Sequence, residues 1–310
     1  MKKPAVRLCD LPSPLPVRDG IAPSYAWLPE GNWPTIYAFL LDRFAVIGES
    51  ILSKRLANGE IVDEVGLPID LLTPYKAGKR IWYYREVEAE PRIPFEAEIL
   101  FQDAHLLVVD KPHFLPMSPA GNYLKETLLI RLRAALNNQD ITPIHRLDRE
   151  TAGVVMFCLT PELRGKYQRL FEAREVQKTY EAIAPWKDGL SFPRVHQSKM
   201  VDGDHFVTMK EVPGEPNSET EMSVLARFGD WALYQLKPHT GRKHQLRVHL
   251  ASLGIPILHD PFYPIMLPDK GDDFSKPLQL LARSIEFIDP ITHMTRHFVS
   301  KRHLNGMEGL

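Results

Sequence analysis

The chain has 310 residues, of which 44% are hydrophobic and 25% charged, and this allows one large core or a catalytic domain with a smaller companion. A formal net charge of −1 excludes a strongly basic protein, so any nucleic-acid footprint must be local. No apolar run is long enough to span a bilayer and the N-terminus lacks the apolar core of a signal peptide, so we expect a cytoplasmic protein. The two cysteines, Cys9 and Cys158, suit a reducing compartment and are too few for a cysteine-based zinc site.

Two small segments are predicted to precede the main domain. Residues 1–34 are rich in proline and predict an irregular arm. Residues 35–89 predict an accessory domain, because apolar residues at helical spacing indicate two helices and are followed by turns and short strands. The order of the second helix, the NGEI turn and the KAGKRI turn is similar to the S4-type RNA-binding fold. The alternative is a small domain that only packs against its neighbour.

The main domain is predicted for residues 90–310, after a linker of charged residues and prolines. Residues 123–136 and 161–174 predict helices, and residues 186–217 predict loops and short hairpins. Strands outnumber helices and their connections differ in length, so the pattern predicts an α+β domain and argues against a parallel, doubly wound one. The predicted strands are residues 97–101, 105–109, 154–159, 177–183, 223–226 and 231–236.

Polar residues are concentrated before one of these strands. The stretch TPIHRLDRETAGVVMFCL, residues 142–159, carries His145, Arg146 and Asp148 and ends in an uncharged apolar run. Such a short run of β-forming residues predicts a buried core strand. Asp148 is then expected in the loop that enters the strand, where a rigid element holds its carboxylate in place. This is a suitable position for a catalytic group.

A second informative stretch is locally basic. Residues 237–254, KPHTGRKHQLRVHLASLG, contain no acidic residue. Leucines at helical spacing, followed by Gly254, predict a helix over residues 243–253. Arg242 and Lys243 then occupy the first turn, where cations oppose the helix macrodipole, and this favours an anion such as a phosphate bound there. An ordinary solvated turn is the alternative.

Together these stretches resemble the RluA-type pseudouridine synthases. HRLDRETAG at residues 145–153 is similar to the family's HRLDxxTSG signature, and GRKHQLRVH at residues 241–249 is similar to its GRxHQLRxH motif. KTY at residues 178–180 is similar to the second motif, and the order of the motifs agrees over about residues 95–298. The chain departs from the family at three positions without removing an ionisable group from the expected site: Ala152 replaces serine, His259 replaces glycine, and Leu281 replaces histidine.

The resemblance implies a fold, a reaction and the residues that perform it. The fold is a catalytic domain on a mixed, largely antiparallel sheet flanked by helices and loops. The reaction is the isomerisation of a flipped-out uridine in RNA to pseudouridine, in which a C–N glycosidic bond breaks and a C–C bond forms without a cofactor. The implied catalytic residues are Asp148 as the essential carboxylate, Tyr180 against the base, and Arg247 paired with Asp148. The implied RNA contacts are His145, Arg146, Arg242, Lys243 and Gln245, with Arg146 filling the space that the base leaves.

Two further hypotheses belong to other functional classes. The basic stretch and the S4-like segment also suit a non-catalytic RNA-binding module, and the histidines suit a metallohydrolase. We expect no metal, however, because the spacing of His244 and His249 does not place both on one helix face. The expected partner is RNA, with 23S ribosomal RNA favoured over tRNA by the S4-like segment. We also expect no membrane association and a monomeric chain.

Overall fold

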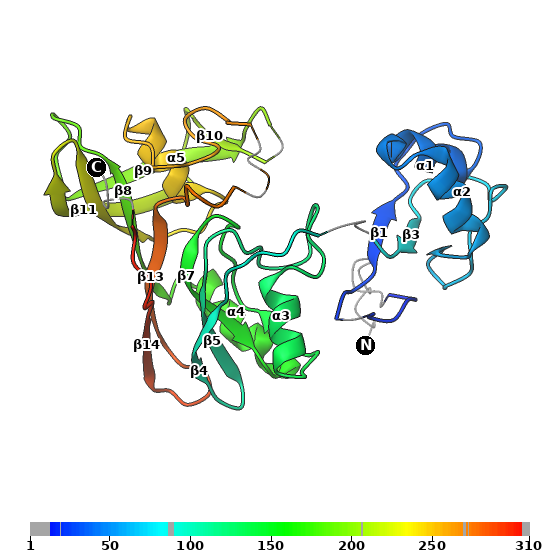
Figure 1. Ribbon diagram of the computed structural model, residues 1–310, viewed down its shortest axis with the longest axis horizontal. Helices are drawn as coiled ribbons and strands as arrows, with labels where there is room; N and C mark the ends of the chain where they lie inside the picture. The colour runs from blue at the N-terminus through cyan, green and yellow to red at the C-terminus, as the bar shows by residue number, and fades with distance from the viewer. Residues whose placement is uncertain are drawn as a thin grey trace, which may run out of the picture. The chain divides into compact units, whose positions relative to one another are not determined.

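The computed structural model describes residues 13–18, 20–85, 90–205, 207–268, 271 and 273–305. The chain divides into two compact units, Met1–Ala89 and Glu90–Leu310, and each has its own apolar core (Figure 1). No helix among the described residues is long and apolar enough to cross a membrane.

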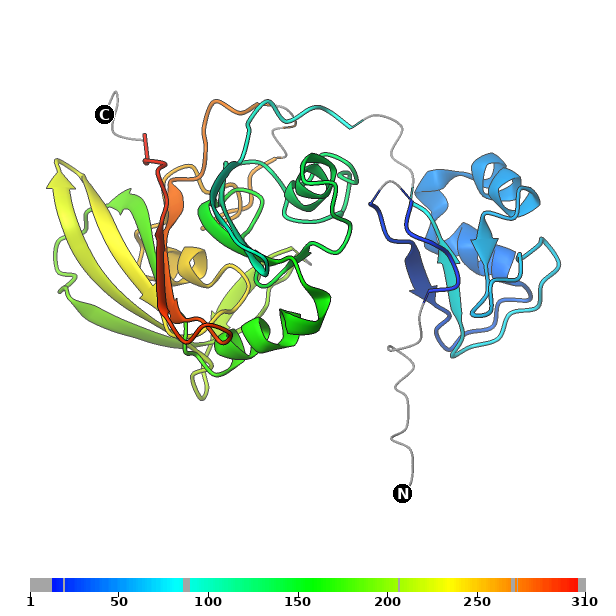
Figure 2. The same cartoon turned by 90° about the horizontal axis from the view of Figure 1, so that it is seen from below.

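The N-terminal unit is a three-stranded antiparallel sheet, in the order β1-β3-β2, with two helices beside it (Figure 2). Thr35 caps the first helix, because its Oγ1 accepts a hydrogen bond from the Ala38 N–H at 3.1 Å. Apolar side chains of both helices, such as Phe39 and Leu52, pack with Ile81 of the sheet. The elements are β1 (Ser24–Trp27), α1 (Ile36–Arg43), the 3₁₀ helix η2 (Ala45–Ile47), α2 (Glu49–Ala57), β2 (Ile61–Val62) and β3 (Arg80–Tyr83).

Strand β1 differs from the prediction of an irregular arm over residues 1–34. Residues 24–27 of that segment pair with β3, with Tyr25 opposite Trp82. A four-residue strand gives a weak periodic signal beside so many prolines, which explains why the sequence did not reveal it. Residues 1–12 of the predicted arm lie outside the described residues.

The C-terminal unit is built on an eleven-stranded sheet in the order β10-β9-β11-β12-β8-β13-β7-β5-β4, with β14 beside β13 and β6 beside β7. The pairing of β13 with β7 is parallel and the others are antiparallel. This confirms the predicted α+β fold on a mixed, largely antiparallel sheet. The elements are β4 (Glu98–Gln102), β5 (Leu106–Lys111), α3 (Leu128–Ala135), β6 (Thr142–Pro143), β7 (Ala152–Cys158), η3 (Pro161–Leu163), α4 (Arg164–Glu172), β8 (Gln177–Pro185), β9 (Arg194–Asp202), β10 (Met209–Val212), β11 (Ser218–Phe228), β12 (Trp231–Pro238), α5 (Gln245–Ser252), β13 (Leu280–Ile288) and β14 (Thr295–Val299).

Strands β5 and β7 are buried on both faces. Side chains alternate along each strand, so one set packs in the core with α3 and the other in the core with α4. A strand covered on both faces has no polar side, which explains the uninterrupted apolar run over residues 154–158. The first set includes Leu107, Val109, Val155 and Phe157, and the second includes Leu106, Val108, Val154 and Met156.

Helix α5 packs on the other half of the sheet. Leu246 and Leu250 lie in one apolar core with Tyr234 and Leu236 of β12. The sequence predicted only loops and short hairpins over residues 186–217, but β9 is a nine-residue strand that pairs with both β10 and β11. Its sequence RVHQSKMVD is mostly polar, so the apolar alternation that reveals most strands is weak there.

A glycine is required where the two halves of the sheet meet. Gly153 of β7 lies beside Ala282 of β13 with a φ of +113°, and a Cβ at this position would be 2.2 Å from the Ala282 carbonyl oxygen. Any side chain would therefore force β7 and β13 apart. The glycine of the HRLDRETAG stretch is thus explained by the parallel strand pairing that follows the Asp148 loop.

Candidate active site

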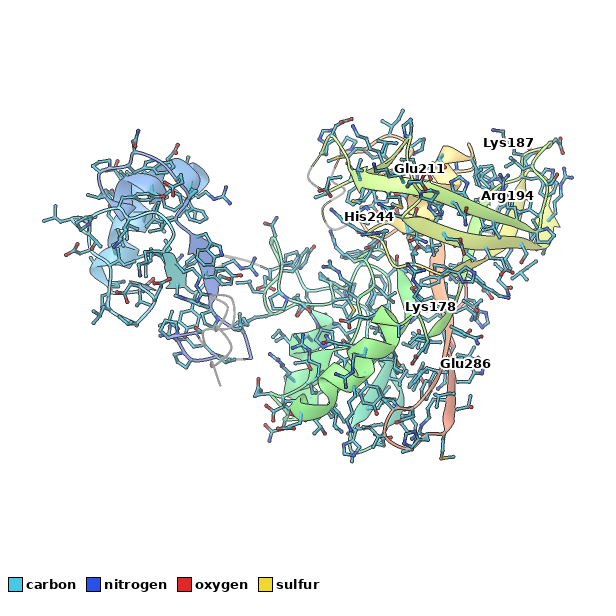
Figure 3. All side chains as sticks on the ribbon, turned by 180° about the vertical axis from the view of Figure 1, so that it is seen from behind. Lys178, Lys187, Arg194, Glu211, His244 and Glu286 are labelled. Atoms are coloured by element: carbon cyan, nitrogen blue, oxygen red, sulfur yellow. The ribbon has the colours of Figure 1, made fainter. Side chains whose placement is uncertain are left out.

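A cleft of ≈ 950 Å³ lies in the C-terminal unit, at the entry to β7. Its walls come from the loop before β7, the end of α4 with the start of β8, and the turn before α5 with α5 itself. The three residues expected to be catalytic, Asp148, Tyr180 and Arg247, all line it. Figure 3 marks Lys178 and His244, two further lining residues from separate parts of the chain.

Arg247 on α5 joins two carboxylates. Its Nη1 donates a hydrogen bond to Asp148 Oδ2 at 3.2 Å, while Nε and Nη2 donate to the two oxygens of Asp260 at 2.8 and 2.7 Å. The bidentate contact with Asp260 fixes the plane of the guanidinium. The side chains of Arg247 and Asp260 are each 1% exposed, whereas that of Asp148 is 24% exposed. Of these three groups, Asp148 is the one open to the cleft.

The surroundings of Arg247 keep it charged. Burial by itself lowers the pKa of Arg247, but hydrogen bonds and the charges of Asp260 and Asp148 outweigh burial and raise the pKa above its usual value. The rings of Phe262 and Tyr263 lie 4.9 and 5.4 Å from the guanidinium carbon and add cation–π contacts. Arg247 is therefore a fixed cation beside Asp148. The sequence analysis did not assign Asp260 to the site, because only the folded chain brings its carboxylate to Arg247.

His244 is a further residue at Asp148 that the sequence analysis missed. It precedes α5 with a φ of 55°, which is uncommon for a residue with a side chain, and its Nε2 lies 3.8 Å from Asp148 Oδ2. Burial lowers the pKa of His244 to about 4, so the ring is neutral at pH 7. Its Nδ1 lies 2.9 Å from Tyr263 Oη, which accepts a hydrogen bond from the Met209 N–H at 2.8 Å. If the Tyr263 hydroxyl donates to Nδ1, both groups are satisfied, and the His244 proton is assigned to Nε2, which faces Asp148.

Tyr180 on β8 presents an aromatic ring and a protonated hydroxyl to the same cleft. Burial, followed by the charge of Asp148, raises the pKa of Tyr180 above its usual value. The ring packs against the apolar core below α3 and against the core below α5. Tyr180 therefore lies where the two halves of the sheet meet, and it is held by both.

Cationic side chains surround the cleft. Arg146 is exposed, and among the described residues no hydrogen bond or ion pair holds its side chain. Arg242 is also exposed, and its Nε donates to the Asn217 carbonyl oxygen at 3.2 Å. Apart from Asp148, the acidic side chain among the lining residues is Glu172. The cationic residues of the lining are Arg146, Arg174, Lys178, Arg242, Lys243 and Arg247.

His145 has a structural role in the loop before β7. Its Nε2 accepts a hydrogen bond from the Met156 N–H at 3.1 Å, and its ring stacks on Phe171 at 4.8 Å between centroids. Burial lowers the pKa of His145 to about 3, so the ring is neutral at pH 7. Nδ1 is the ring nitrogen left for the predicted RNA contact, which stays a prediction.

Gln245 also lines the cleft, but it is 4% exposed and each polar atom of its amide already has partners in the protein. It is the first residue of α5, two positions later than the predicted start of the helix. The buried amide fixes the turn before α5, and the predicted RNA contact stays a prediction. Oε1 accepts from Thr240 Oγ1 at 2.7 Å and from the Arg242 N–H at 3.0 Å, and Nε2 donates to the Glu219 carbonyl at 2.9 Å and to Thr220 Oγ1 at 3.0 Å.

Comparison with known proteins identifies this arrangement. The profile of the family described as RNA pseudouridylate synthase matches residues 105–252. The dual-specificity RNA pseudouridine synthase RluA of Haemophilus influenzae is 32% identical over 225 residues, which cover 69% of this chain and 97% of that protein. The mitochondrial tRNA pseudouridine(32) synthase of Saccharomyces cerevisiae is 31% identical over 226 residues, which cover 69% of this chain and 47% of that protein. A structure of human RNA pseudouridylate synthase domain containing 4 matches with a TM-score of 0.52 and 28% identity, covering 66% of this chain and 88% of that one.

The chain therefore belongs to the RluA type of RNA pseudouridine synthases, a family of isomerases. This confirms the family, the fold and the class of reaction that the motifs predicted. Residues 105–252, which the family profile matches, do not include the N-terminal unit. The S4-like interpretation of residues 35–89 and the predicted domain boundaries stay predictions.

Proposed function

We propose that this chain isomerises uridine to pseudouridine in ribosomal RNA, with Asp148 as its essential carboxylate. The observation that carries the proposal is the state of Asp148: its carboxylate is half-buried, tied to a fixed guanidinium, and open to a cleft surrounded by cations. A structural ion pair would leave no such opening. The arrangement suits a reacting carboxylate that must stay oriented while substrate enters.

The two oxygens of Asp148 have different surroundings. Arg247 and His244 both face Oδ2, and Oδ1 has no hydrogen-bond or ion-pair partner among the described residues. Oδ2 therefore anchors the side chain, and Oδ1 is the oxygen that acts on the ribose or the base. The N–H dipole of the neutral His244 ring also faces Oδ2, so Arg247 supplies the positive charge at this oxygen and His244 adds none.

The reaction itself needs only positioning and proton transfer. The glycosidic C–N bond of uridine breaks, the detached base turns, and a C–C bond to the same sugar forms; the base carbon loses its hydrogen and the former glycosidic nitrogen gains one, so atoms and electrons balance. Tyr180 supplies a flat surface against the base, and its hydroxyl can donate a proton. No redox partner or group donor enters this balance.

The cationic groups around the cleft fit an RNA strand with one nucleotide flipped out. Flipping costs roughly a few kcal/mol, and a planar guanidinium such as the exposed Arg146 can fill the vacated space by stacking and hydrogen bonding. Arg242 and Lys243 are placed to contact phosphates, which position the strand without reading its sequence.

The proposal of ribosomal RNA rests on the N-terminal unit. The S4-like interpretation of residues 35–89 supports this choice, and α2, β2 and β3, which follow one another in this segment, belong to a unit separate from the cleft. A transfer RNA is the alternative, supported by the similarity to the yeast tRNA pseudouridine(32) synthase. Pseudouridine mapping of total RNA from a strain lacking the gene distinguishes them: a site lost from ribosomal RNA supports the proposal, and a site lost from tRNA supports the alternative.

The role of Asp148 has a direct test. Since the base carbon gives up its hydrogen, tritium release from RNA containing 5-tritiated uridine measures the reaction. We expect Asp148→Asn to reduce release to background with an unchanged melting temperature, while Asp230→Asn, which changes an exposed aspartate away from the cleft, keeps full activity. Full activity of Asp148→Asn would exclude the mechanism, and RNA binding by the wild type without isomerisation of any cellular RNA would favour a non-catalytic binding module.

A further inference from the structure

A second cluster of polar side chains lies between α5 and the outer strands of the sheet. His196 of β9, Glu211 of β10 and His249 of α5 bring one donor atom each within 4.8 Å of one another. His196 Nε2 lies 2.9 Å and His249 Nε2 lies 3.9 Å from Glu211 Oε1. We propose that these three residues bind one divalent transition metal ion of the Zn²⁺ type, which joins the β9–β10 hairpin to α5. Figure 3 shows Glu211 on its strand in this part of the C-terminal unit.

The backbone directs all three side chains to one place. Glu211 is directly opposite Met200 in the β10–β9 pairing, and His196 is four positions before Met200 on β9, so these side chains share a face of the sheet. His249 reaches that face from α5 and is fully buried. A helix–sheet interface is normally apolar, so a histidine, a carboxylate and a second histidine at its centre require a specific reason.

The charge of Glu211 supplies that reason. The Glu211 carboxylate is half-buried and lies 2.9 Å from His196 Nε2 and 3.9 Å from His249 Nε2, and among the described residues no lysine or arginine pairs with it. A bound cation would compensate the partly buried negative charge.

The donor set and its surroundings match what a Zn²⁺ ion requires. Two imidazole nitrogens and one carboxylate oxygen are a known three-residue ligand set for this metal, with a fourth position left for water. The second ring nitrogen of His249, Nδ1, lies 3.0 Å from Thr220 Oγ1, and such a contact orients a ligating ring. Ser198 and Ser218 hydroxyls, 3.2 and 3.0 Å from His249 Nε2, can bond to the water or to the carboxylate.

The sequence could not show this site. The sequence analysis compared His249 only with His244, which is five positions earlier in the predicted helix, and that spacing does not place the two rings on one helix face. The actual neighbours, His196 and Glu211, lie 53 and 38 positions earlier in the chain, and strand β9 was not predicted. The site is separate from the Asp148 cleft, because none of the three residues lines it.

Metal binding by the full-length chain tests the proposal. After treatment with a chelator, we expect calorimetry to show one Zn²⁺ bound per chain, and Co²⁺ to give the visible absorption of a four- or five-coordinate site. Glu211→Gln and His196→Gln should each weaken binding by roughly 10-fold or more, because each removes one of three ligands. His297→Gln, which removes an exposed histidine of β14, is the control and should bind as the wild type does.

Thermal melting separates loss of the metal from loss of the fold. Each protein is compared with its own metal-free form, and Zn²⁺ should raise the melting temperature of the wild type and of His297→Gln only. Absence of one-to-one binding by the wild type overturns the proposal, even if a variant fails to fold. Equal binding by the wild type and both cluster variants overturns it as well.

Discussion

The two halves of the large sheet stabilise the site in different ways. Around β5 and β7 the packing is apolar on both faces, and α3 and α4 exclude water from the strand that follows Asp148. Around β9, β10 and β11 the space under α5 contains carboxylates, histidines and hydroxyls joined by hydrogen bonds. The first half fixes where the Asp148 loop begins, and the second fixes where Arg247 and His244 lie. The positions of Asp148, Arg247 and His244 thus depend both on the apolar core around β5 and β7 and on the hydrogen-bond network under α5.

Because of this difference, we expect mutations in the two halves of the sheet to reduce stability for different physical reasons. In the apolar half, a change of volume should destabilise the fold, because the packing leaves no room. In the polar half, a change of charge should matter more than a change of volume, because an unpaired buried ion is costly. The predictions below test this difference, beginning with the largest effect expected from a single residue.

We expect Gly153→Ala to destabilise the protein by roughly 4 kcal/mol or more, or to prevent folding, because overpacking adds to an unfavourable positive φ. The added Cβ would lie 2.2 Å from the Ala282 carbonyl oxygen. Urea unfolding measures the effect. Gly229→Ala is the matched control, since Gly229 has a φ of +58° but no heavy atom within 4 Å of an added Cβ, and it should cost only about 1 kcal/mol. Equal costs for the two variants would contradict the role of strand pairing.

In the polar half, Asp260→Asn conserves volume and removes one negative charge beside the buried Arg247 guanidinium. We expect a loss of about 3 kcal/mol of stability, since breaking a buried pair leaves a charge poorly compensated. Tritium release should fall as well, because Arg247 is no longer held in one plane. Asp202→Asn at an exposed position should change neither measurement. A stable and fully active Asp260→Asn would show that Asp148 alone suffices to hold Arg247.

Acid should destabilise the protein through buried histidines of both halves. The pKa is lowered by burial to about 4 for His113, His244 and His249 and to about 3 for His145. The unfolded chain binds protons near pH 6.5 and the folded chain does not, so stability is complete above pH 6.5 and falls as the pH drops toward 4. We expect a loss of about 1 to 2 kcal/mol for each histidine at pH 5. Urea unfolding at pH 7 and pH 5 checks this, and equal stability at the two values would show that these rings are accessible to protons.

The smallest effect is expected at the surface of the cleft. Lys243→Gln should leave stability unchanged and weaken binding to a single-stranded RNA segment, reducing the slope of log affinity against log salt by about 0.7. Lys166→Gln on the exposed side of α4, away from the lining residues, should leave the slope unchanged. Identical slopes for both variants would place the RNA backbone elsewhere.

Local patterns predicted the elements that carry the motifs. The strand predicted over residues 154–159 corresponds to β7, which spans Ala152–Cys158. The helix predicted from residue 243 corresponds to α5, which begins two residues later. The uninterrupted apolar run and the helical spacing are signals that a short window contains. Strand β9 was missed because its side chains are mostly polar on a face that a helix nevertheless covers.

The hydrogen-bond contacts between site residues were harder to predict than which residues line the cleft. Asp148, Tyr180 and Arg247 were expected from their motifs and all line the cleft. Asp260 and His244 were not expected, and Gln245 was assigned to RNA although its amide is satisfied within the protein. Hydrogen-bond partners depend on how distant segments meet, and a motif does not encode that.

The pairing of Arg247 with Asp260 has a consequence for turnover. A carboxylate that bonds to a substrate changes its charge or its position, and a guanidinium that relied on it alone would be left buried and uncompensated at that moment. Here Asp260 retains two hydrogen bonds to Arg247 whatever Asp148 does. Under the proposed function, Asp148 can therefore release and regain its contact in each catalytic cycle while Arg247 keeps a carboxylate partner.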